Sequence, residues 1–164
     1  GKLSNVLAAF GLALESEADV INTSFGVSGN SYALYKMLNR ADEKGVIVVS
    51  AAGNNGQDEN FYPATYGESI AVAGVDDYGS KMPRSNFGDW VDLAALGNRI
   101  YSTVPGNQYA YKSGTSPATA YVSAVIANML AADPYLTKEE ILNALYEGAD
   151  EIEEGELAGV AIVK

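Results

Sequence analysis

The stretch SGTSPATAYVSAVIANMLAA, residues 113–132, decides the fold of this chain. Its first four residues predict a tight turn, and Pro117 fits the first turn of a helix, where its missing N–H breaks no hydrogen bond. From Ala118 onward small or apolar residues occupy every face, and none carries a charge. This composition is typical of a buried helix. We therefore predict a central helix over residues 118–132, buried all round and ended by the Asp-Pro pair that follows.

Ser116 stands at the N-terminus of this predicted helix and has two interpretations. In the first it is an N-cap, a position that serine favours. In the second it is a nucleophile, because the unpaired N–H groups and the helix dipole at that end stabilise developing negative charge. The turn by itself favours the cap, so the rest of the chain has to decide.

Helices and strands alternate along the rest of the chain. Apolar spacing predicts helices over residues 3–18, 32–43 and 137–148, and strands over residues 20–26, 46–52, 69–75 and 91–95. The run 46–52 is continuously apolar, as in a parallel strand buried on both faces. We expect one α/β domain over residues 1–164, with three layers and helices on both faces of a mostly parallel sheet. The glutamates of the tail after Gly148 are interpreted as a solvated acidic surface: Glu151, Glu153, Glu154 and Glu156.

The composition excludes several classes of function. A net charge of −11 leaves no basic patch to neutralise phosphates, so no nucleic-acid partner is expected. No window approaches the roughly eighteen apolar residues of a membrane span, so no membrane partner is expected. The absence of cysteine excludes disulfides and thiolate metal sites.

Five segments, in order along the chain, resemble motifs of the subtilisin-like serine proteases. Residues 113–120 resemble the nucleophile motif Gly-Thr-Ser-Met-Ala-(Ser/Thr)-Pro. Ala-Ala-Gly-Asn at 51–54 is similar to the strand end of the oxyanion hole, and Val-Ile-Asn-Thr-Ser-Phe-Gly at 20–26 to the substrate-binding strand. Two further loops match, at 62–64 and 85–87. Each match is weak, but the ordered set is specific.

The resemblance implies peptide-bond hydrolysis through an acyl-enzyme, with Ser116 as nucleophile and Asn54 as the side-chain donor of the oxyanion hole. It implies a peptide or protein substrate, no required cofactor, and a secreted or extracellular location, with a cytoplasmic one left open. A calcium or sodium ion on the backbone carbonyls of Ala64 and Tyr66 is also compatible with it. The substrate-binding residues that it implies are Ser24, Phe25, Gly26, Ala51, Ala52, Gly53 and Phe61.

Four positions depart from the family pattern. Pro117 replaces the usual methionine, Ala120 the usual proline, and Tyr121 a residue that is often histidine. Leu96 stands where the family commonly has proline. None of these changes removes a catalytic atom.

The catalytic aspartate and histidine of the family lie in an N-terminal portion that this sequence does not contain, and the chain has no histidine at all. A serine hydroxyl is a poor nucleophile without a base. We therefore interpret residues 1–164 as the C-terminal portion of a subtilisin-like catalytic domain. Its expected partner is an N-terminal protease fragment that supplies the histidine and aspartate, or a second copy of itself.

Two alternatives stay open. The chain is also compatible with a catalytically incomplete fragment or pseudoprotease that binds peptides or a partner chain. It is further compatible with an unrelated α/β binding domain whose Gly-Thr-Ser turn is a helix cap by chance.

The strand at 20–25 is the place where a partner is expected. By resemblance it is interior in a whole family domain, with an N-terminal strand beside it. Val20 and Ile21 are adjacent apolar residues, and neither lysine nor proline guards the strand as an edge requires. The sequence therefore predicts a bare sheet edge that pairs with another chain.

Overall fold

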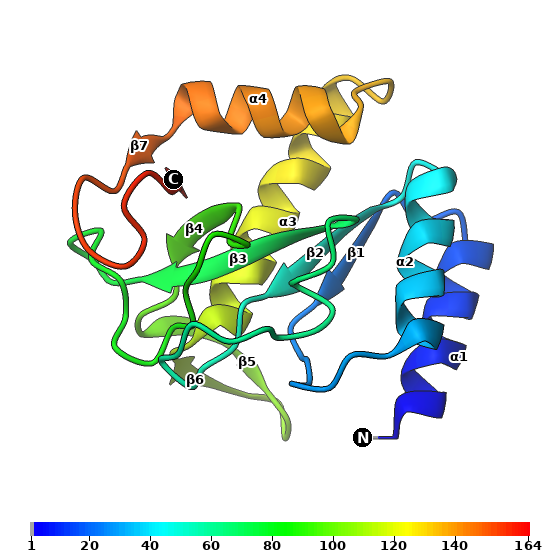
Figure 1. Cartoon of the computed structure of the whole chain (residues 1–164), viewed down its shortest axis with the longest axis horizontal. Coiled ribbons are helices and arrows are strands. Elements are labelled where there is room, and N and C mark those ends of the chain that lie inside the picture. Colours follow the sequence, from blue (N-terminus) through cyan, green and yellow to red (C-terminus); the bar gives the residue numbers. More distant parts are fainter. Residues whose placement is uncertain (1) are drawn as a thin grey trace.

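The computed structural model describes residues 2–164 (Figure 1). Its helices are α1 (Leu3–Glu15), α2 (Tyr32–Glu43), α3 (Thr115–Ala132) and α4 (Lys138–Gly148). Its strands are β1 (Val20–Thr23), β2 (Ile47–Ala51), β3 (Ser69–Val75), β4 (Leu93–Leu96), β5 (Ile100–Val104), β6 (Gln108–Lys112), β7 (Asp150–Glu151) and β8 (Ala161–Val163).

A six-stranded sheet in the order β1-β2-β3-β4-β8-β7 forms the centre of the molecule. Strands β1 to β4 and β8 are parallel, and only β7 runs antiparallel to its neighbour. Strands β5 and β6 form a separate antiparallel hairpin directly before α3. The predicted mostly parallel α/β sheet is therefore confirmed.

Helices cover both faces of the sheet, as alternate residues of β2 show. Ile47 and Val49 belong to a core that includes residues of α3 and α4, whereas Val48 packs with residues of α1 and α2. Side chains along a strand point alternately to its two faces, so these contacts place the two helix pairs on opposite sides. In Figure 1, α1 and α2 stand beside β1 while α3 passes behind the sheet.

A row of buried hydroxyl groups ties the first strand to the sheet interior. The Thr23 hydroxyl on β1 donates to Ser50 Oγ on β2 at 2.6 Å, and Ser50 Oγ is hydrogen-bonded in turn to Ser69 Oγ on β3. All three side chains are buried. Because buried polar groups are costly unless they are paired, this row fixes the positions of the three strands relative to one another.

The prediction that α3 is buried on every face is wrong. Ala118, Val122 and Ile126 are fully buried, but Ala120 and Ala124, on the other side of the helix, are exposed. No element within residues 2–164 covers that side. Small apolar residues suit both a buried helix and one that awaits a partner, so composition alone did not separate these cases.

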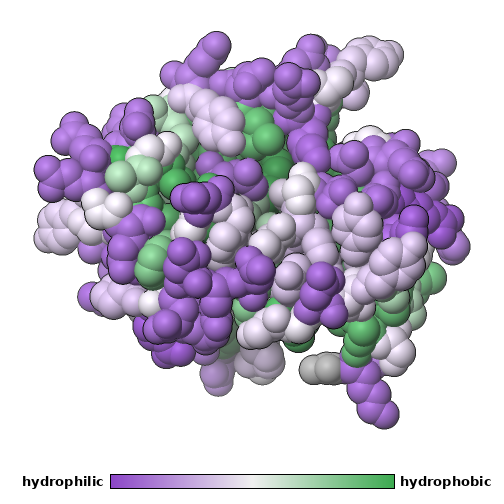
Figure 2. Space-filling view, viewed as in Figure 1, coloured by the Kyte–Doolittle hydropathy of each residue, from purple (hydrophilic) through white to green (hydrophobic). Residues whose placement is uncertain are grey.

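The glutamates of the tail are exposed, as the sequence predicted, but the tail also contributes to the core. Ile152 and Leu157 are buried, and β8 pairs with β4 in the sheet. The apolar residues stand singly between charged ones, which hides them from a reading by composition. Figure 2 shows the result as a mainly hydrophilic face with hydrophobic atoms visible in a hollow below α4.

The described helices include none that is both long and apolar enough to cross a membrane.

Strand β1 lies at one end of the sheet and pairs only with β2. Its outer side therefore leaves backbone N–H and C=O groups without a neighbouring strand, as the sequence predicted for a bare edge.

We expect the 164-residue chain to associate through this edge when no other chain covers it. Sedimentation velocity at micromolar concentration measures the association. A monomer with slow amide exchange throughout Val20–Thr23 contradicts the prediction.

Candidate active site

The N-terminus of α3 lies against the carboxyl end of β1. Helix α3 begins at Thr115 with Gly114 as its N-cap, so Ser116 is the second residue of the helix. The Ser116 hydroxyl donates to the carbonyl oxygen of Ser24 at 2.9 Å, and the Ser24 hydroxyl donates to the carbonyl oxygen of Ser116 at 2.9 Å. The N-cap interpretation of Ser116 is therefore wrong, because its side chain points across to β1.

Asn54 reaches the same helix terminus from the carboxyl end of β2. The N–H of Thr115 donates to Asn54 Oδ1 at 2.9 Å. Because the oxygen faces an N–H donor, the other side of the amide must carry the Nδ2 group. Within the described residues, no hydrogen bond engages that Nδ2, which leaves it available as a donor near the N-terminus of α3.

Thr115 connects the N-terminus of α3 to the loop after β2, and the sequence analysis did not identify it as a site residue. Its Oγ1 accepts a hydrogen bond from the N–H of Gly53 at 3.2 Å while its own N–H is bound by Asn54. The residue is fully buried. The Gly-Thr-Ser motif contains Thr115, but its contact with residues about sixty positions earlier depends on the tertiary fold.

Two glycines permit this close approach. Gly114 has a φ of 147°, and a Cβ there would lie 2.9 Å from Asn54 Oδ1. Gly97 accepts the N–H of Gly114 at 2.9 Å, and a Cβ on Gly97 would lie 2.5 Å from the Gly114 carbonyl oxygen. Both glycines therefore allow the turn before Ser116 to pack closely, Gly114 against the Asn54 amide and Gly97 against the backbone of Gly114.

The predicted substrate-binding residues lie together. Ser24, Phe25 and Gly26 follow β1, whereas Ala51, Ala52 and Gly53 end β2 and lead into the loop of Asn54. Phe25 is 48% exposed, and Ala51 and Ala52 are buried. The Phe61 ring lies between the two groups, because a Cβ added at Gly26 or at Gly53 would meet it.

No ionisable side chain hydrogen-bonds to Ser116 or to the side-chain amide of Asn54 within residues 2–164. The groups whose pKa values are shifted lie away from Ser116 and Asn54. Burial raises the pKa of Asp92, against the opposing effect of the hydrogen bond from the Ala71 N–H and of the charge on Lys138. Burial also raises the pKa of Tyr146. The candidate site thus contains a hydroxyl and amide donors but no base.

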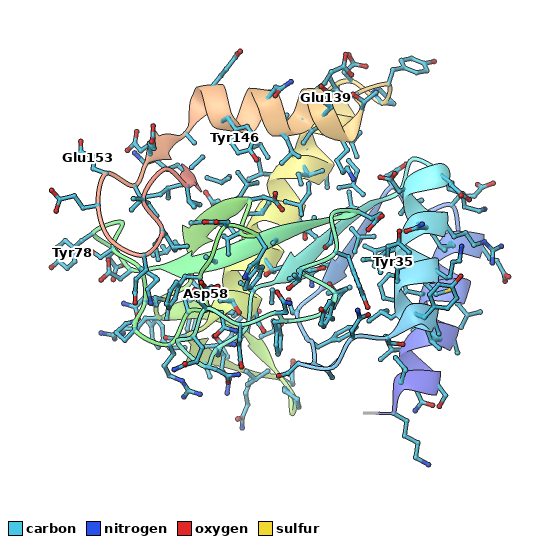
Figure 3. All side chains as sticks on the ribbon, in the orientation of Figure 1. Tyr35, Asp58, Tyr78, Glu139, Tyr146 and Glu153 are labelled. Carbon is cyan, nitrogen blue, oxygen red and sulfur yellow. The ribbon has the colours of Figure 1, made fainter. Side chains whose placement is uncertain are left out.

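A large cleft of the molecule lies away from this site. A cleft of about 1080 Å³ lies between the loop after β3 and the acidic tail, and Ser24, Asn54 and Ser116 are absent from its lining. Tyr78 and Glu153, which line it, lie at the same flank of the molecule in Figure 3.

Residues 2–164 contain no group of three or more histidine, cysteine, aspartate or glutamate side chains arranged to hold a metal ion. A cation near Ala64 and Tyr66 would depend on backbone oxygens, and the Tyr66 carbonyl already accepts the N–H of Ser69 at 2.9 Å. The predicted calcium or sodium site stays a prediction.

Comparison with known proteins decides the family. The sequence profile of the subtilase family, peptidase family S8, matches residues 1–159. The chain belongs to the subtilase family. This assignment removes the alternative of an unrelated α/β domain with a chance helix cap.

Curated relatives of this subtilase chain are longer than the chain itself. It is 43% identical over 152 residues to the thermophilic serine proteinase of Bacillus sp. (strain AK1), covering 93% of this chain and 37% of that protein. It is 44% identical over 119 residues to thermitase of Thermoactinomyces vulgaris, covering 73% of this chain and 42% of that protein. The chain therefore spans about two fifths of these relatives.

Solved structures agree with the fold. A cold-adapted subtilisin-like serine proteinase superposes with a TM-score of 0.91 at 30% identity, over 99% of this chain and 61% of that one. The prenylagaramide maturation protease PagA superposes with a TM-score of 0.87 at 24% identity, over 99% of this chain and 65% of that one, and supports the fold alone. This subtilase chain thus corresponds to part of a subtilisin-like domain.

Gly97 provides a test of the packing beneath the turn. Gly97→Ala should destabilise the chain by about 1–3 kcal/mol, because the new methyl group meets the Gly114 backbone. Gly67→Ala is the matched control, since a Cβ there meets nothing within 4 Å. Urea denaturation of both variants gives the two free energies of unfolding. Equal stabilities would show that the turn does not depend on this close contact.

Proposed function

We propose that this chain carries the nucleophile and the oxyanion hole of a serine-type endopeptidase. The observation that supports the proposal most directly is the arrangement of the α3 N-terminus. Ser116 is the second residue of the helix, and the N–H of Thr115, the residue before it, donates to Asn54 Oδ1. In the proposed site, the Ser116 hydroxyl and the Asn54 Nδ2 face the same space.

In the proposed reaction the Ser116 Oγ attacks the carbonyl carbon of the scissile peptide bond. The proton that Ser116 now donates to the Ser24 carbonyl passes to a base as the new bond forms. The substrate oxygen gains negative charge, which the Asn54 Nδ2 and the backbone N–H of Ser116 stabilise. The base then passes the Ser116 proton to the amine nitrogen as the C–N bond breaks, and the same base deprotonates the water that hydrolyses the acyl-enzyme and returns that proton to Ser116 Oγ. Fixed donors of this kind act without reorganising during the step.

The base is the part that this chain lacks. We propose that a histidine, oriented by an aspartate, comes from a protease segment outside these 164 residues, which contain no histidine. The side on which that segment would lie is open in two respects. Among the described residues, strand β1 pairs with β2 alone, and one face of α3 is exposed. An N-terminal protease portion covering both surfaces agrees with these features.

We further propose that an extended peptide pairs beside residues 24–26, in the manner of an added β-strand. The segment 51–53 forms the opposite wall of the primary specificity pocket. The Phe61 ring lies against both walls, so it limits the depth of that pocket and favours small substrate side chains. Secretion, which the family resemblance implies, stays a prediction.

A second candidate is a pseudoprotease that binds peptides or a partner without cleaving them. The observation in its favour is that no ionisable side chain of the described chain reaches Ser116. This candidate differs from the first only in what the rest of the protein supplies, so one comparison separates them.

The deciding comparison is peptide-ester hydrolysis by the 164-residue chain and by the whole protease that contains it. The isolated chain should be close to inactive, since enzymes without their triad keep only about 10³–10⁴-fold acceleration over water. The whole protease should turn over the ester, and Ser116→Ala should abolish the turnover. An inactive whole protease supports the pseudoprotease, and full activity of the isolated chain contradicts the proposal of an external base.

Asn54 tests the oxyanion hole in the active protease. Asn54→Ala should lower kcat by roughly 10²–10³ with little change in KM, because its amide acts in the transition state. Asn55→Ala is the matched control, since its exposed side chain donates to Glu59 and not into the site. The kinetics are corrected for the folded fraction. A loss of stability at unchanged kcat would reduce Asn54 to a structural residue.

A further inference from the structure

The loop that carries Asn54 is held along its length by one other segment. The segment is residues 84–87, called the clamp below. The N–H of Gly56 donates to the Arg84 carbonyl at 2.9 Å, and the N–H of Phe87 donates to the Gln57 carbonyl at 3.3 Å. The exposed Arg84 side chain also donates to the Asn54 carbonyl at 3.3 Å. The clamp thus lies alongside the oxyanion loop over residues 53–57.

Asn86 is the buried centre of the clamp and makes three contacts with this loop. Its backbone N–H donates to the Gly53 carbonyl at 3.0 Å. Its side-chain Oδ1 accepts the N–H of Asn55 at 2.9 Å and the N–H of Gln57 at 3.4 Å. The residue is 0% exposed. One amide oxygen therefore fixes the backbone on both sides of the turn that follows Asn54.

The other half of the Asn86 amide is unsatisfied. Its Nδ2 is buried and has no hydrogen-bond partner in the described part of the chain. It lies under Gly53, where a Cβ would come within 2.5 Å of it. Turning the amide over would not help, because Nδ2 would then face two N–H donors. The residue thus keeps an unpaired polar group while its Oδ1 makes two acceptor contacts to the loop.

The clamp is itself anchored to the sheet. The Ser85 hydroxyl accepts the N–H of Gly74 on β3 at 3.0 Å and donates to the Asn86 carbonyl at 3.0 Å. The N–H of Met82 donates to the Gly74 carbonyl at 2.9 Å. Asn86 therefore connects the loop of Asn54 to the central strand β3. Thr115 hydrogen-bonds to the same loop from the side of α3.

We propose that Asn86 is a positioning residue that sets the Asn54 amide at the distance from Ser116 that the oxyanion requires. This inference rests on the proposed protease function. Asn86 touches no reacting atom in it and acts only through the oxyanion loop. Without its Oδ1, the N–H groups of Asn55 and Gln57 lose their acceptor, and the loop relaxes away from α3.

The test is a double-mutant cycle in the whole protease, with kcat and KM measured per active site titrated by an acylating inhibitor. Asn86→Ala should lower kcat about 10- to 100-fold with KM nearly unchanged, as for a misplacement of about 1 Å at a reacting centre. In an Asn54→Ala background it should lower kcat by no more than about twofold, because the group that it positions is gone. Asn39→Ala on α2, another asparagine with an unpaired buried amide atom, should leave kcat unchanged.

Losses that multiply in the double variant, or an unchanged kcat per active site in Asn86→Ala, would overturn the inference. If Asn86→Ala does not fold, Asn86→Ser replaces it in the same cycle, since its shorter side chain cannot span the same contacts. A whole protease without Ser116-dependent turnover refutes the proposed function instead. In that case a crystal structure of the Asn86 variant decides, with loss of the hydrogen bond from the Thr115 N–H to Asn54 Oδ1 expected and its retention contradictory.

Discussion

The hydrogen bond from the Thr115 N–H to Asn54 Oδ1 is the contact on which the candidate site depends. It joins the first residue of α3 to the loop after β2, and it turns the Asn54 amide so that Nδ2 is free. The contact requires Gly114 and Gly97, because a side chain at either would displace the turn. The hydrogen-bonded hydroxyls of Thr23, Ser50 and Ser69 fix β1, β2 and β3 relative to one another beside this contact.

The same structure is closed on one side and open on the other. Toward β3 and β4, the sheet is buried and carries the clamp that holds the oxyanion loop. Toward β1, the sheet ends, a face of α3 is exposed, and no ionisable side chain of residues 2–164 hydrogen-bonds to Ser116. These three features agree with a chain that spans part of a subtilisin-like domain. They agree with the proposal that a second segment supplies the base for Ser116.

Much of this could be predicted from the sequence because the relevant signals are local. Periodicity gave the strand and helix order, and the Gly-Thr-Ser turn together with Ala-Ala-Gly-Asn gave the two ends of the site. The roles of Thr115 and Asn86 are not local, since each hydrogen-bonds to residues distant in sequence. The exposed face of α3 was not predicted for a related reason. Alanine suits a buried helix face as well as one that awaits a partner, so its presence does not show which elements cover the helix.

The most direct test of the account is covalent labelling of the whole protease with a fluorophosphonate, followed by peptide mapping by mass spectrometry. Such reagents react with a serine only where a base activates it and an oxyanion hole receives the phosphonyl oxygen. We predict one adduct, on Ser116, and none on Ser24 or Ser113, which lie close by. An adduct on another serine, or no adduct on a folded protease, would contradict the assignment of Ser116 as nucleophile.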